Sequence, residues 1–110
     1  MSASVNGDNI SLTRGDTLIL NVVIEKNEEI YTPTSEDTIR FALNTHKRGR
    51  EEPIIYKDID PNTMKLVIEP EDTKDLEYGV YWYDIEITTG DGYVDTFIGP
   101  AKFKITEEVY

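Results

Sequence analysis

Residues 76–88 read LEYGVYWYDIEIT and decide the fold class, because apolar and polar side chains alternate along most of this stretch. Alternation at every second residue is the pattern of a β-strand with one buried face and one wet face. The strand predicted over residues 80–88 has one face made of Tyr81, Tyr83, Ile85 and Ile87, and another made of Trp82, Asp84 and Glu86. The stretch therefore predicts a strand that packs one face against an apolar core and leaves the other face in water.

The same period of two recurs elsewhere in the chain, over residues 17–24, 38–44, 64–69 and 101–106. Turn residues separate these segments, and Gly90-Asp91-Gly92 gives the clearest hairpin signal. Gly99-Pro100 predicts a break in the last strand, because proline cannot donate a ladder hydrogen bond. About seven or eight short antiparallel strands are expected, and they predict an all-β fold of sandwich type.

Only residues 70–77, PEDTKDLE, favour a helix, because the segment begins with proline and carries acids in its first turn. We expect at most one short helical turn there, carrying the chain from one sheet to the other. The length of 110 residues suits one domain, residues 1–110, with residues 1–8 as a flexible N-terminal arm.

The segment Gly79-x-Tyr81-x-Tyr83 resembles the tyrosine corner of immunoglobulin-like domains. The resemblance implies that the Tyr81 hydroxyl bonds back to the crossing that precedes the strand. Tyr83 would stand where antibody domains place a cysteine. Because the chain has no cysteine, aromatic packing must take the place of the disulfide.

The composition and charge of the chain disfavour several classes of partner and argue against a signal peptide and a membrane span. The formal net charge is −11, from 22 acidic and 11 basic residues, which disfavours nucleic acids and anionic membranes. The N-terminus has no basic start and no apolar run, so it is not a signal peptide. The longest apolar-rich run, Leu18 to Ile24, is too short to span a bilayer. We expect a soluble protein made in the cytoplasm.

Arg14-Gly15-Asp16 is the tripeptide that integrins recognise, but it lies between two predicted strands with little room to turn. Gly15 can adopt a positive φ, and Asp16 can bond to nearby backbone amides. We interpret the tripeptide as a turn. Gly90 and Gly92 are expected to serve the later hairpin in the same way.

Catalytic and metal-binding chemistry finds no support in the sequence. Two groups could suggest a calcium site: Asp58, Asp60 and Asn62, and the pair Asp91 and Asp95. Neither has the spacing of a calcium loop, so we expect a solvated acidic rim, with no metal and no cofactor. The basic loop His46-Lys47-Arg48-Gly49-Arg50 is either a solvated loop or a contact for an acidic partner. No nucleophile has a recognisable base, so we do not expect an enzyme.

Several apolar residues fall on faces that are expected to be wet: Trp82, Ile19, Val23 and Val67. Such residues indicate either an interface or a patch that a loop or the N-terminal arm covers. An alternative function is a bacterial surface or carbohydrate-binding module, in which exposed rings stack on sugars. The candidate rings are then Trp82, Tyr78 and Tyr93.

Three stretches resemble a known family: ISLTRGDTLIL at 10–20, TIRFALN at 38–44, and the long segment from Leu66 to Val109. They are similar to small phage and prophage proteins with the immunoglobulin-like N-terminal domain of baseplate upper proteins. The resemblance implies a virion structural role and contacts with other virion proteins or with further copies of the chain. It implies no catalytic residues. Because the chain ends at Tyr110, without a coiled coil or receptor-binding tail, a free-standing accessory domain of the tail or capsid is an equal alternative.

Overall fold

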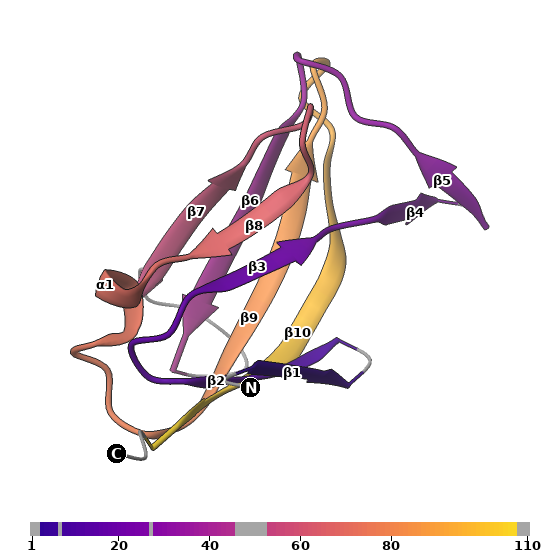
Figure 1. Cartoon of the computed structure of the whole chain (residues 1–110). Coiled ribbons are helices and arrows are strands. Elements are labelled where there is room, and N and C mark those ends of the chain that lie inside the picture. Colours follow the sequence, from indigo (N-terminus) through magenta and orange to yellow (C-terminus); the bar gives the residue numbers. More distant parts are fainter. Residues whose placement is uncertain (1–2, 7, 27, 46–52, 108–110) are drawn as a thin grey trace.

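The computed structural model describes residues 3–6, 8–26, 28–45 and 53–107 (Figure 1). This part of the chain is all-β with one short helix, as the alternating segments predicted. The elements in chain order are β1 (Ala3–Asn6), β2 (Asn9–Thr13), β3 (Leu18–Asn21), β4 (Ile24–Lys26), β5 (Glu29–Tyr31), β6 (Thr38–Asn44), β7 (Ile55–Ile59), β8 (Lys65–Ile68), α1 (Pro70–Thr73), β9 (Gly79–Thr88) and β10 (Val94–Thr106).

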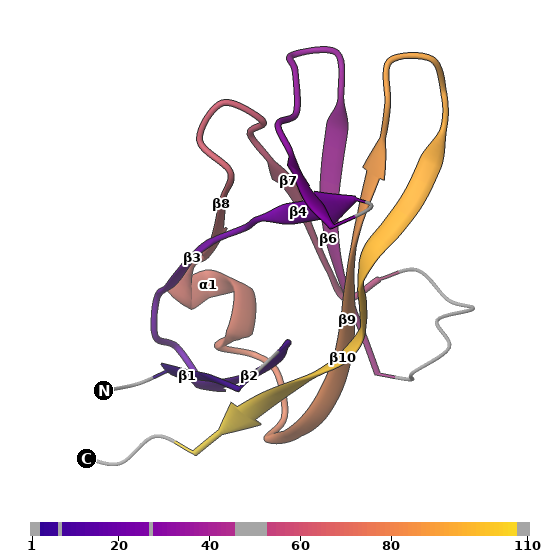
Figure 2. The same ribbon diagram turned by 90° about the vertical axis from the view of Figure 1, so that its right-hand side faces the viewer.

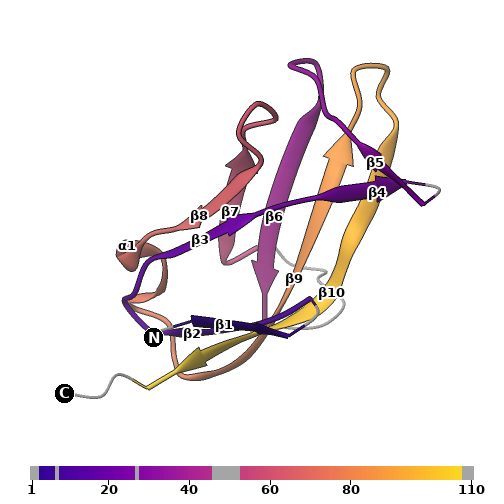
Figure 3. The same cartoon turned by 45° about the vertical axis from the view of Figure 1, so that its right-hand side comes forward.

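The strands form one six-stranded sheet, in the order β1-β2-β10-β9-β6-β7, and two pairs, β3-β8 and β4-β5. Figure 2 shows the six-stranded sheet curling around, with β3-β8 lying across from β9 and β10. The buried faces of these two layers meet in a single apolar core. The β4-β5 hairpin continues the line of β3 toward the β10 side (Figures 1 and 3).

The described residues hold ten strands rather than the seven or eight expected. One reason is that residues 17–24, predicted as one strand, divide into β3 and β4. β3 pairs with β8, whereas β4 leaves that layer and pairs with β5. The alternation of side chains continues through the division, with Val22 and Ile24 both buried, so the sequence pattern did not reveal it.

Residues 3–6 were expected to belong to a flexible arm, and this was wrong: they form β1. β1 pairs with β2 in antiparallel register, with Val5 opposite Ile10. The backbone of β1 thereby supplies hydrogen-bond partners for the N–H and C=O groups on the outer edge of β2, which would otherwise be unpaired.

The expectation of purely antiparallel strands was also wrong. β2 runs parallel to the end of β10, with Ile10 opposite Phe103 and Leu12 opposite Ile105. β10 is long enough to pair with β9 along one side while its last residues pair with β2 along the other. All four of these β2 and β10 side chains are buried, so the parallel pairing extends the core.

Three aromatic rings pack together at the centre of the core. The ring centroids of Phe41 and Tyr83 lie 5.3 Å apart, and each lies 6.1 Å from the centroid of Phe103. The contacts with Phe103 are edge-to-face, an arrangement that stabilises by roughly 0.5–1.5 kcal/mol per pair beyond burial. The rings come from β6, β9 and β10, so they join three adjacent strands of the large sheet.

The helix α1 lies in the crossing between β8 and β9, as predicted. The Asp72 carboxylate accepts the backbone N–H of Glu69 at 2.7 Å, which caps the helix start. The same carboxylate lies 2.8 Å from the Lys57 ammonium of β7. The crossing is thereby attached to the edge of the six-stranded sheet.

The proline predicted a break in the last strand at Gly99-Pro100, and this was wrong. β10 continues through it with register shifts between Thr96 and Ile98 and between Ile98 and Ala101. At the second shift the extra residues, Gly99 and Pro100, have no partner in β9, so the proline costs no ladder hydrogen bond.

We predict that Gly99→Ala is far more destabilising than Gly92→Ala. Both glycines have a positive φ, of 115° and 90°, so both substitutions impose backbone strain. A Cβ at Gly99 would also lie 2.6 Å from Asp84 Cβ and 2.8 Å from the Tyr83 carbonyl oxygen, whereas nothing lies within 4 Å at Gly92. Urea unfolding should give losses of about 3 kcal/mol or more and about 1 kcal/mol, respectively. Equal losses would contradict the close packing of the bulge.

Candidate functional site

The Arg14-Gly15-Asp16 turn is fixed against the crossing that follows α1. The Arg14 guanidinium donates to the Tyr78 hydroxyl at 2.7 Å and to the Leu76 carbonyl at 3.3 Å, and its Cζ lies 4.2 Å from the Tyr78 ring centroid. The Gly15 N–H donates to Thr73 Oγ1 at 2.9 Å. The tripeptide therefore links β2–β3 to the α1–β9 crossing, and an integrin would have to break these contacts to use the arginine.

Tyr81 makes the hydrogen bond that the tyrosine-corner resemblance implied. Its hydroxyl donates to the Glu77 carbonyl at 2.8 Å, which fixes the crossing at the start of β9. Burial is the main cause that raises the pKa of Tyr81, and the nearby Glu77 carboxylate adds to it.

Tyr83 is buried two residues further along, and its hydroxyl donates to the Asp8 backbone carbonyl. Burial raises the pKa of Tyr83 to about 12, with the charge of Asp8 as a second cause. This contact joins the centre of the large sheet to the beginning of β2. Sequence reasoning assigned Tyr83 to packing but did not find its partner, because Asp8 is 75 residues away.

The four outward apolar residues lie on two opposite surfaces. Ile19 and Val67 are directly opposite each other on the outer side of β3-β8. Ile19 is 60% exposed, and Val23, just beyond the end of β3, is 56% exposed. Trp82 lies on β9 between the inward Tyr81 and Tyr83, so it faces away from the core on the outer side of the large sheet. The four residues therefore cannot form one interface.

Trp82 is only half-exposed, and the Lys102 ammonium of β10 lies 5.9 Å from its ring. Asp84 lies two residues further along β9 on the same face. Burial is the main cause that raises the pKa of Asp84, and the Glu86 charge is a second cause. Arg40 pairs with Asp58 at 3.0 Å and stacks over Tyr56 on the same outer face. This face is a mixed surface, on which the exposed Tyr56 and Val80 lie among charged side chains.

The three rings proposed for carbohydrate stacking do not share a surface. Tyr78 precedes β9 and Tyr93 follows it, so the ten-residue strand separates them by roughly 30 Å. Trp82 lies between them along the strand. The fold therefore provides no single surface on which the three rings could stack against one sugar chain.

The hairpin between β9 and β10 closes as the glycines predicted. The Gly92 N–H donates to the Thr89 carbonyl, and the Thr89 N–H donates to the Tyr93 carbonyl, both at 2.8 Å. Gly90 packs against the Glu36 side chain, and a Cβ added there would lie 3.0 Å from Glu36 Cβ.

A shallow, open hollow of about 380 Å³ lies beside this hairpin. It is lined by Tyr31, Glu36, Thr89, Gly90, Asp91 and Tyr93. The Tyr31 hydroxyl donates to Asp37 at 2.7 Å, and this bond is the main cause that raises the pKa of Tyr31. The Thr34 N–H, followed by the Tyr31 hydroxyl, lowers the pKa of Asp37. These bonds hold the loop before β6 in place.

Asp58, Asp60 and Asp91, which were considered for calcium, serve local structure. Asp58 pairs with Arg40, and the Asp60 carboxylate accepts the Asn62 N–H at 2.8 Å within the β7–β8 turn. Asp91 accepts from Thr89 in the last hairpin. In residues 3–6, 8–26, 28–45 and 53–107, no group of three or more His, Asp or Glu side chains is arranged to hold a metal ion. The loop His46–Arg50 lies outside the described residues.

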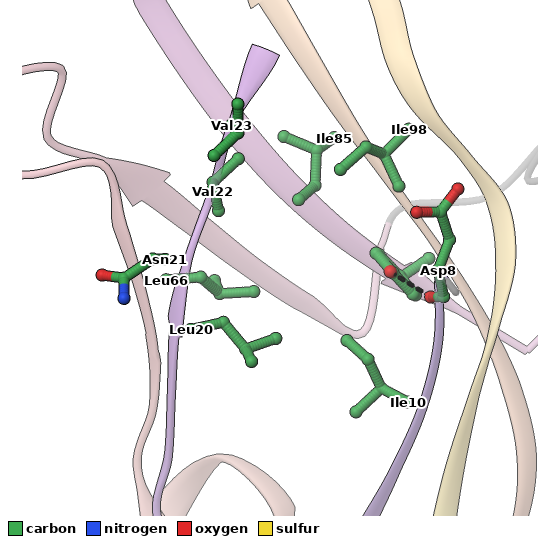
Figure 4. Close-up of a pocket in the computed structure, with 10 residues that line it drawn as sticks. Asp8, Ile10, Leu20, Asn21, Val22, Val23, Leu66, Ile85 and Ile98 are labelled. Atoms are coloured by element: carbon green, nitrogen blue, oxygen red, sulfur yellow. Dashed lines mark hydrogen bonds between the residues drawn. The ribbon is translucent and has the colours of Figure 1, made fainter. Parts of the chain in front are cut away.

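A narrower apolar pocket of about 230 Å³ opens between β3 and the β2–β10 side of the core (Figure 4). Its lining is aliphatic except at Asp8, Asn21 and Tyr83, and Figure 4 shows the Asn21 side chain directed away from the pocket. The full lining is Asp8, Ile10, Leu20, Asn21, Val22, Val23, Leu66, Tyr83, Ile85 and Ile98. Of the residues predicted for an interface, only Val23 reaches this pocket.

Sequence reasoning missed the pocket because its wall comes from five separate strands and two connecting segments. Alternation places Leu20, Val22 and Ile85 on inward faces, and the structure shows Val22 and Ile85 buried and Leu20 partly buried against the core. Alternation does not say where the two layers fail to close. No signal in the sequence marks that gap.

Comparison with known proteins finds no family model, no curated protein and no solved structure that matches the chain. No helix in the described part of the chain has the length and apolar character needed to cross a membrane. The function is therefore inferred from the geometry of the chain itself.

We predict that Tyr83 links stability to alkaline pH. Its phenol ionises near pH 10 in the unfolded chain but only near pH 12 in the folded chain, so the unfolded state loses its proton first. This contribution to stability is complete below pH 10 and is lost as the pH rises toward 12. Absorbance titration should show a phenol that ionises near pH 12, and Tyr83→Phe should remove it.

The exposed Tyr93→Phe is the matched control for deletion of a hydroxyl. If Tyr83→Phe leaves the high-pH end of the titration unchanged while Tyr93→Phe alters it, burial of the Tyr83 hydroxyl is wrong. Below pH 10, loss of the bond to Asp8 should cost Tyr83→Phe about 1 kcal/mol in urea unfolding.

Proposed function

We propose that the protein is a non-catalytic, immunoglobulin-like domain that works by binding other proteins. The β8–β9 crossing between the two layers and the Tyr81 bond to Glu77 support the immunoglobulin-like assignment. The aromatic cluster at Phe41, Tyr83 and Phe103 occupies the centre, where such a domain without cysteine needs to replace a disulfide.

The observation that carries a binding role is a set of exposed apolar side chains on the outer side of the β3-β8 layer. Ile19 and Val23 are more than half exposed, Val67 lies opposite Ile19, and the apolar pocket opens next to Val23. Exposed apolar side chains that adjoin a pocket are the usual composition of a contact surface. On the outer face of the large sheet Trp82 is half-buried beside Lys102, and the exposed Val80 and Tyr56 lie opposite or under basic side chains.

The family resemblance suggests the setting. A structural component of a phage or prophage particle, made in the bacterial cytoplasm and assembled into a baseplate, tail or capsid, would act through such surfaces. The charge of −11 would keep the free chain soluble and apart from nucleic acid until it meets its partner.

We predict that tagged chain produced in the cells that encode it sediments with assembled particles. Ile19→Asp should release it, because a carboxylate would have to be desolvated in the contact. Thr96→Asp, an exposed position on β10 of the other layer, is the matched control and should stay with the particles. Circular dichroism should show that both variants are folded.

Trp82→Ala identifies the face in use. If Trp82→Ala releases the chain and Ile19→Asp does not, the contact belongs to the large sheet and the proposed surface is wrong. A chain that never sediments with particles contradicts the virion role.

A further inference from the structure

We propose that the pocket and the open edge of β3 accept an extended segment of a basic partner protein. The segment adds as a strand beside β3 and places one aliphatic side chain in the pocket. This inference rests on the proposed function, and it specifies how the contact is made and which chemistry the partner carries.

The first observation is an unpaired backbone edge. The Val22 N–H donates to the Met64 carbonyl at 2.8 Å, and the same register pairs Leu20 with Leu66. In an antiparallel pair, hydrogen-bonded residues alternate with residues whose N–H and C=O point the other way. Ile19 and Asn21 therefore direct these groups away from β8, and among the described strands β3 has no second neighbour.

The second observation is that the pocket lies on this same side of β3. Consecutive residues from Leu20 to Val23 line it, whereas β8 contributes only Leu66. Figure 4 shows Leu20 and Val22 facing Ile10 and Ile85 across the pocket. An added strand would therefore meet backbone hydrogen-bonding groups and an apolar cavity at once.

The size and lining of the pocket select the anchor. A volume of about 230 Å³ is below the roughly 300–1,000 Å³ of typical small-molecule sites, but it accommodates an aliphatic side chain. The Tyr83 hydroxyl is already bonded to the Asp8 carbonyl, so it does not call for a polar ligand group. Strand addition commonly combines main-chain bonds for affinity with pockets for alternate side chains that give specificity.

Charge argues for a basic partner rather than a second copy. Two copies of a chain with net charge −11 repel each other, whereas a segment with lysine or arginine is attracted. The Asp8 carboxylate is exposed at the rim of the pocket, where a basic residue next to the anchor could pair with it.

The test uses the hexapeptide Lys-Leu-Lys-Val-Lys-Leu with blocked ends and its version with glutamate in place of lysine. NMR amide signals of residues 19–23 should shift with the lysine peptide and not with the glutamate peptide. Asn21→Pro removes an N–H that β8 does not use, so the fold should be retained. Its affinity for the peptide should fall about tenfold.

Asn21→Ala is the matched control, because it keeps the backbone N–H and changes only a side chain that points away from the pocket. It should bind the peptide as the unaltered chain does. Ile98→Phe, which fills the pocket while leaving the β3 edge intact, should also weaken binding about tenfold.

Three results would overturn strand addition: no shift with the lysine peptide, equal affinity of Asn21→Pro and Asn21→Ala, or concentration-dependent pairing of the chain that buries the β3 edge against a second copy. Particle sedimentation separates this inference from the proposed function. If Ile19→Asp leaves the particles while Asn21→Pro stays, the binding role holds and strand addition is wrong. If the unaltered chain never joins particles, the virion role fails regardless of the peptide result.

Discussion

The rest of the structure depends on the contact between the three rings of Phe41, Tyr83 and Phe103 and the inner side of β3-β8. A chain of 110 residues with no cysteine has no disulfide between its layers, so apolar burial must supply most of the free energy that holds them together. The rings fill the centre of the large sheet, and Leu66 and Ile68 of the small layer belong to the same core. Toward β2 and the end of β3 the layers separate, and the apolar pocket lies where they do.

Several of the basic side chains are used inside the fold. Arg14 ties the first turn to Tyr78, Arg40 pairs with Asp58 across the large sheet, and Lys57 holds the helix through Asp72. Exposed ion pairs contribute little stability, about 0–1 kcal/mol each, but these also position connecting segments. With all its basic residues counted, the chain still carries a net charge of −11, which is consistent with a partner of opposite charge.

Much of the fold follows from the alternation of side chains in the sequence. It placed Tyr81 and Tyr83 inside, Trp82 outside, and Ile19 and Val23 on an exposed face, and the helix at Pro70–Thr73 followed from its proline and acids. Alternation reports which face of a strand is buried, but not which strand lies beside it. For that reason the parallel pairing of β2 with β10, the division of residues 17–24 and the strand β1 were not found.

The candidate site was accessible from the sequence only in part. Exposed apolar residues were identified one by one, yet their distribution over two opposite surfaces depends on the pairing of strands distant in the sequence. The open edge of β3 was hidden for the same reason, because an edge is defined by the absence of a neighbour. The hydrogen bond from the Tyr81 hydroxyl to the Glu77 carbonyl could be predicted, since the two residues are only four apart in the sequence.

Amide hydrogen exchange in the free chain, read residue by residue by NMR, tests the open edge most directly. We expect slow exchange at Leu20, which pairs with Leu66 of β8, and at Val22, whose N–H donates to Met64 just before β8. We expect fast exchange at Ile19 and Asn21, whose N–H groups face away from β8. Uniformly slow exchange across these four residues would show that the edge is already paired and would contradict the account.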